Sequence, residues 1–145
     1  MRKPHADDAL LTAFLPAEGA QSLKMETLRS PSSEKSIRHD LISGVTEFRI
    51  SDDGGRRRHV DSGMEVDDRV LERYTTCDGD PLSTRASIER TLELGRDTWR
   101  IRIETDSLMT ADRTHFHVSN HLDAFEDGVR VYTRSWDKSI PRNMV

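Results

Sequence analysis

Cysteine is almost absent from this chain, since Cys77 is the only one among 145 residues. A single cysteine excludes an intrachain disulfide and any site built on a Cys-x-x-Cys pair. The sequence also lacks an apolar run long enough to span a membrane and an apolar segment typical of a signal peptide. We therefore expect a cytoplasmic protein, in a reducing compartment and without a membrane partner.

Glycine is sparse, and its spacing excludes three motifs. The eight glycines stand at positions 19, 44, 54, 55, 63, 79, 95 and 128. No two are four positions apart, as a Gly-x-Ser-x-Gly nucleophile elbow requires. None are two or five apart, which excludes the dinucleotide fingerprint and the phosphate loop. A catalytic triad would have to come from scattered residues such as Ser83, His59 and Asp61, and we expect none.

Apolar residues are also few, at 34% of the chain against 33% charged residues. The composition predicts a thin core, a disordered segment or a partner that covers one face. The net charge of −4 gives no reason to expect nucleic acid as a partner. We interpret the basic run at 56–58 as part of a solvated strand rather than as a nucleic-acid patch.

What the chain does have is strict alternation between residues 85 and 137. Trp99, Ile101 and Ile103 fall on one side of a pleat, and the charged residues between them fall on the other. This period of two is typical of an antiparallel sheet with one apolar face. The pattern predicts an all-β fold, and we expect an antiparallel β-sandwich.

Two hairpins follow from turn signals. Gly95-Arg96 predicts a turn that sets Leu92 opposite Trp99. The same register places Arg90 on the apolar face, where its guanidinium must reach an edge, a carboxylate or a partner. Asp127-Gly128 is a strong hairpin signal. It predicts an inner face made by Val118, Leu122, Ala124, Val129 and Val131.

The first part of the chain differs from the rest. Residues 1–35 are expected to form an extended or partly mobile arm, with a short helix at 7–14 and one strand near 24–28. Residues 36–145 are expected to form the sandwich. A further turn is predicted at 52–55, where the sequence reads Asp-Asp-Gly-Gly.

Three histidines offer a metal site as one alternative. His115, His117 and His121 share a face if they lie on one strand, because their spacings are even. Two imidazoles about 7 Å apart along a strand can bind one metal ion. We favour the other interpretation, in which they are ordinary polar residues of the outer face.

The same strands predict an interaction face rich in aromatic and basic side chains, a composition that protein contacts favour. A solvated sheet face remains an alternative of similar weight. The expected face consists of His117, His121, Phe125, Arg130, Tyr132, Arg134 and Trp136.

An ordered series of short stretches carries a resemblance to a known family. The series resembles the C-terminal end of CocE/NonD-type serine hydrolases, the group that includes Xaa-Pro dipeptidyl-peptidases and cocaine esterase. It covers residues 30–145 and is made by the stretches 66–74, 80–86, 99–102, 114–118, 122–125 and 134–142.

The resemblance implies an α/β-hydrolase domain followed by a jelly-roll β-sandwich, of which this chain matches only the latter part. No position here matches the family's catalytic residues, so we expect no enzyme activity and no cofactor. We expect a non-catalytic accessory domain, a partial jelly roll that acts as a homodimer or docks on a separately encoded α/β-hydrolase chain. A stand-alone module that binds a small ligand or a carbohydrate is the alternative.

Overall fold

In the computed structural model, which describes residues 16–143, eight strands form one antiparallel sheet. The strands are β1 (Met25–Arg29), β2 (Ser32–Asp40), β3 (Val45–His59), β4 (Glu65–Cys77), β5 (Asp80–Arg96), β6 (Trp99–Ala111), β7 (His115–Glu126) and β8 (Val129–Pro141).

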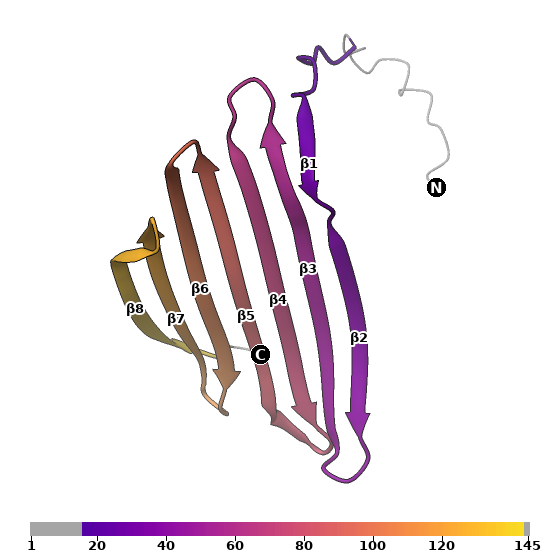
Figure 1. Cartoon of the computed structure of the whole chain (residues 1–145). Helices are drawn as coiled ribbons and strands as arrows, with labels where there is room; N and C mark the ends of the chain where they lie inside the picture. Colours follow the sequence, from indigo (N-terminus) through magenta and orange to yellow (C-terminus); the bar gives the residue numbers. More distant parts are fainter. Residues whose placement is uncertain (1–15, 144–145) are drawn as a thin grey trace, which may run out of the picture.

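The connections from β2 to β8 are hairpins between neighbouring strands, so the sheet is an up-and-down meander (Figure 1). β1 and β2 both pair with β3 and together form one edge, while β8 forms the other edge. Residues 16–143 contain neither a second layer nor a helix. The predicted all-β antiparallel class is confirmed, and a sandwich would require a second layer.

The predicted N-terminal segments have different outcomes. The short helix at 7–14 lies outside the described residues. The strand expected near 24–28 is present as β1, which pairs with the end of β3. The sheet therefore begins at Met25, and the expected boundary at residue 35 falls inside β2.

The turn predicted at 52–55 is a bulge, because β3 continues through it from Val45 to His59. The register to β4 shifts between Asp53 and Arg56. Gly55 has a φ of 72°, and a Cβ there would clash with the backbone of the segment between β1 and β2. Glycine thus allows the bulge to take a left-handed conformation where another backbone passes closely.

The turn between β5 and β6 lies two residues later than predicted. Asp97, with a φ of 53°, and the residue after it form the turn, so Arg96 pairs with Trp99. The predicted pairing of Leu92 with Trp99 is wrong, since Leu92 pairs with Ile103. Because the difference is an even number of residues, the apolar and polar faces stay as predicted.

The predicted turn at Asp127-Gly128 is confirmed, but the strand register predicted from it is wrong beyond Phe125. The pairing with β7 shifts after Phe125, so that Ala124 lies opposite Tyr132 instead of Val131. The extra residue, Val131, is a bulge that reverses the alternation in the rest of β8. This single bulge decides which face of the sheet the remainder of β8 joins.

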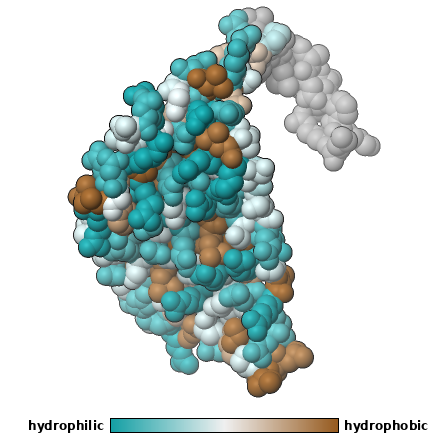
Figure 2. Space-filling view, viewed as in Figure 1, coloured by the Kyte–Doolittle hydropathy of each residue, from teal (hydrophilic) through white to brown (hydrophobic). Residues whose placement is uncertain are grey.

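The sheet has one apolar and one polar face. Ladder partners lie on the same face, and the register pairs Leu94 with Ile101 on one face and Glu93 with Arg102 on the other. Figure 2 views the polar face and shows hydrophilic side chains over most of it. In residues 16–143 no apolar side chain is buried, so this single layer has no core of its own.

Candidate functional site

The apolar face is the largest functional candidate in the described structure. It runs over six strands, and no element of residues 16–143 covers it; Met109, Trp99 and Tyr132 on it are 45%, 40% and 50% exposed. Its centre is made by Ile50, Val70, Ile88, Leu92, Leu94, Ile101, Ile103, Leu122, Ala124 and Trp136.

The charged residue that the sequence placed on this face has found a carboxylate. Arg90 donates two hydrogen bonds to Asp68, from Nε to Oδ1 at 2.9 Å and from Nη2 to Oδ2 at 2.7 Å. Of the three predicted alternatives for Arg90, an edge, a carboxylate or a partner, the structure shows the carboxylate. A bidentate pair of this kind lets a guanidinium lie on an apolar surface.

An apolar face of this extent is unstable in water. Burial of apolar area contributes about 25 cal/mol per Å², and the single layer formed by residues 16–143 does not supply that burial itself. Exposed apolar patches of a few hundred Å² or more mark binding surfaces. The arrangement can therefore bind another apolar protein surface.

The polar face has a buried centre at Asp67 on β4, which is only 2% exposed. Arg69 donates to its Oδ1 at 2.9 Å, and Arg29 from β1 donates to both of its oxygens at 2.9 and 3.0 Å. The Nε atom of Arg56 lies 3.6 Å from Oδ2. Arg29 also pairs with Asp53, so this cluster joins the short strand β1 to the centre of the sheet.

These arginines shift the titration of the acids around them. Burial raises the pKa of Asp67, but the hydrogen bonds from Arg69 and Arg29 outweigh it and hold the pKa below its usual value. Hydrogen bonds from Arg29 also lower the pKa of Asp53. Hydrogen bonding from Arg58 lowers the pKa of Glu65. The carboxylates of Asp53, Glu65 and Asp67 are therefore ionised and paired at neutral pH.

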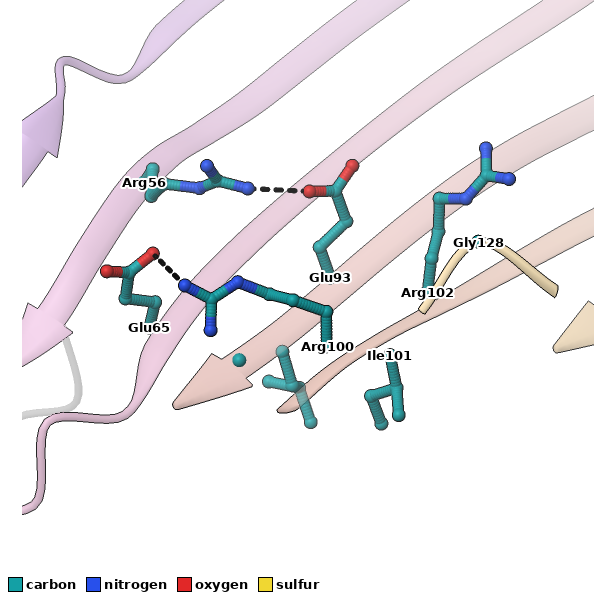
Figure 3. Close-up of a pocket in the computed structure, with 9 residues that line it drawn as sticks. Arg56, Glu65, Glu93, Arg100, Ile101, Arg102 and Gly128 are labelled. Carbon is teal, nitrogen blue, oxygen red and sulfur yellow. Dashed lines mark hydrogen bonds and ion pairs between the residues drawn. The ribbon is translucent and has the colours of Figure 1, made fainter. Parts of the chain in front are cut away.

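A shallow pocket of about 230 Å³ lies beside this cluster, and Figure 3 shows the side chains around it. Arg56 donates to Glu93 at 2.6 Å, and Arg100 lies 3.9 Å from Glu65. Arg100 crosses Gly95, where a Cβ would clash with its side chain. Each of the two acids in its lining, Glu65 and Glu93, already has a basic neighbour.

The three histidines lie on the polar face of β7 as predicted, but they do not converge. The rings of His115 and His117 stack with centroids 6.2 Å apart. His117 Nε2 lies 2.9 Å from Asp112 Oδ2, and this contact is the main cause that lowers the pKa of Asp112. His121 turns toward Ser135 instead. No group of three metal-ligating side chains is found among the described residues.

His121 takes part in an acid, imidazole and hydroxyl chain that the sequence did not reveal. Its Nδ1 lies 2.7 Å from Ser135 Oγ and its Nε2 lies 3.3 Å from Asp123 Oδ2. A hydrogen bond with Thr133 is the main cause that lowers the pKa of Asp123, and His121 adds to it. Only the true register brings His121 opposite Ser135, so a sequence reading could not find this chain.

The expected interaction face is divided between the two sides of the sheet. The bulge at Val131 places Tyr132, Arg134 and Trp136 on the apolar face, opposite Ala124, Leu122 and Asn120. The other four predicted residues, His117, His121, Phe125 and Arg130, lie on the polar face.

The scattered triad of Ser83, His59 and Asp61 does not assemble. Ser83 lies at the start of β5, where its hydroxyl accepts a hydrogen bond from the backbone N–H of Cys77. His59 is the last residue of β3 and lies at the opposite end of the sheet. Its neighbour Arg58 pairs with Glu65, and Glu65 pairs with Gly95, which is near the end of β5. Cys77 is free.

Comparisons with protein-family models, with curated proteins and with solved structures find no match for this chain. Residues 16–143 contain no helix with the length and apolarity that crossing a membrane requires.

Proposed function

We propose that this chain is a non-catalytic β-sheet domain that acts by association and whose apolar face is covered by another protein layer. The uncovered apolar face supports this proposal most directly, since no apolar side chain in residues 16–143 is buried within the chain itself. Two sheets that cover each other's apolar faces form a sandwich about 10 Å thick. The partner supplies the second layer of that sandwich.

The resemblance to the C-terminal domain of CocE/NonD-type hydrolases agrees with an accessory role. In that setting the covering layer is either a second copy of this chain or a separately encoded α/β-hydrolase chain. Self-association is the preferred route, because the complementary face is then always at the same concentration as the chain. The cytoplasmic location belongs to the same proposal and is supported by the single, free Cys77.

We expect the purified chain to be a dimer at micromolar concentration, because residues 16–143 of the monomer have no covered core. Light scattering coupled to size-exclusion chromatography measures the mass directly. The 16.6 kDa chain would then give about twice its own mass. A folded monomer at that concentration would contradict self-association.

We expect no hydrolase activity from the Ser135 chain of hydrogen bonds. The residues lie on an open sheet face, with side chains 41% exposed for His121 and 16% for Asp123, and no nucleophile elbow presents the hydroxyl. Hydrolysis of a nitrophenyl ester should be the same for the wild type, Ser135→Ala and a buffer blank. A rate above the blank that Ser135→Ala removes would contradict the non-catalytic assignment.

A groove of about 430 Å³ on the polar face favours the alternative function, a module for a small ligand or a carbohydrate. Ser87, Ser119 and Ser135 supply hydroxyl groups to its lining, and Arg73 and His121 supply charged or polar groups. Thermal stabilisation of the wild type by a sugar, lost in His121→Ala, would favour this alternative.

A further inference from the structure

We infer that the layer covering the apolar face is a second copy of this chain, packed face to face about a two-fold axis that runs parallel to the strands. This inference rests on the proposed association function, with self-association as its preferred route, and adds the orientation of the second copy. The axis passes midway between β3 and β8, which is between β5 and β6. Each β3 then lies over β8 of the second copy.

Charge on one row of the apolar face carries the argument. The register places Asp52, Val70, Arg90, Thr105, Leu122 and Arg134 in a line across six strands. The acid lies on β3, beside Ser33 of the edge strand β2, and the base ends the row on β8. No ion pair to either Asp52 or Arg134 occurs within residues 16–143, whereas Arg90 in the same row is paired with Asp68.

The two-fold operation brings opposite ends of this row together. Asp52 of each copy faces Arg134 of the second copy, and the reciprocal pair forms at the other end, as an isologous interface requires. Between them, Val70 faces Leu122 of the second copy. Aligned sheets cross at about 30°, which displaces the row ends by about 6 Å, a distance that an arginine side chain spans.

A second row agrees with the same axis. Arg57 on β3 and Glu126 on β7 lie in one row, joined through Val66, Leu94 and Ile101, and the row extends to Thr27 on β1 and Val129 on β8. Here the base is on the β3 side and the acid is on the β7 side. The axis therefore brings Arg57 diagonally beside Glu126 of the second copy, so both rows match opposite charges.

The area is sufficient for a stable pair. With strands about 4.8 Å apart and a rise of about 3.3 Å per residue, the face over β3–β8 has a footprint on the order of 1,000 Å². A standard interface buries about 800 Å² per partner. A second copy can thus cover the apolar face while its polar face remains in water.

Charge reversal tests the arrangement. We expect Asp52→Arg alone and Arg134→Asp alone each to weaken dimerisation by about tenfold or more, because each creates two like-charge pairs. The double variant Asp52→Arg/Arg134→Asp should restore the dissociation constant to within about threefold of the wild type. An equimolar mixture of the two single variants should also associate, since each supplies the charge that the other lacks.

Analytical ultracentrifugation gives the dissociation constants, and Asp106→Arg on the polar face is the matched control that should leave association unchanged. A wild-type dimer that neither single variant weakens, or that the double variant fails to restore, would overturn the arrangement and leave the association function standing. A wild type that stays monomeric would overturn this arrangement together with self-association, and would leave docking on another chain as the remaining form of the association function. Circular dichroism of each variant confirms that these exposed substitutions leave the sheet folded.

Discussion

Ile103→Asp should abolish association, with a dissociation constant raised at least about 1,000-fold. Ile103 lies near the centre of the apolar face, between Leu92 and Ala124. Burial of an isoleucine contributes about 1.5–3 kcal/mol, and burial of an unpaired carboxylate adds a penalty of several kcal/mol. In a symmetric pair the substitution acts twice, so the loss is doubled. Analytical ultracentrifugation measures the change.

The matched control is Leu108→Asp, the same type of change on the same strand but on the polar face. We expect it to leave the dissociation constant within about threefold of the wild type, because Leu108 faces the groove on the other side. Ile103→Thr, which keeps a β-branched side chain, covers the case in which the aspartate variant fails to fold. Equal weakening by Leu108→Asp and Ile103→Asp would show that the apolar face is not the association surface.

Asp67→Asn should destabilise the sheet by about 2 kcal/mol at neutral pH. The amide keeps the shape of the side chain but removes the charge that Arg29 and Arg69 share. The loss of stability is substantial because Asp67 is only 2% exposed. It does not exceed a few kcal/mol because the arginines retain contact with water. Urea denaturation at one fixed protein concentration measures it, since association also contributes to the midpoint.

The same cluster predicts loss of stability in acid. The folded-state pKa values of Asp53, Glu65 and Asp67 lie below their ordinary values, so the unfolded chain binds protons first as the pH falls. Their contribution is complete above the ordinary values of about 4 and disappears as the pH falls through the lower folded values. The free energy of unfolding should therefore decrease as the pH falls below about 5.

In Asp67→Asn that acid decrease should be smaller, because one of the groups with a lowered pKa no longer titrates. Asp106→Asn, at an exposed position of the same face, is the matched control and should keep the wild-type slope. Identical acid slopes for the wild type and Asp67→Asn would show that the Asp67 cluster does not contribute to the pH dependence.

The two faces therefore have different roles in the proposed function. The ion pairs of the polar face hold β1 and the bulged part of β3 against β4, where no apolar core does so. The apolar face remains free to bind another layer. Loss of the ion pairs should lower the stability of the sheet, and disruption of the apolar face should weaken association.

The alternation of residues determined the fold class and, on β5 and β6, which residues share each face. Trp99, Ile101 and Ile103 share the apolar side, as the period of two predicted. Arg90 on the same side pairs with the carboxylate of Asp68, which is one of the outcomes that the sequence predicted. Turn residues also located the hairpin at Asp127-Gly128. These features are local, so propensity and spacing suffice to predict them.

Only the tertiary structure decided the two bulges and what they bring together. The bulge at Gly54-Gly55 exists because the segment after β1 passes against it, and the one at Val131 moved Tyr132 and Trp136 to the apolar face. A one-residue insertion reverses every later side chain, and no local preference fixes it. The burial of Asp67 and the chain from Asp123 to Ser135 depend on the resulting register, because their partners come from other strands.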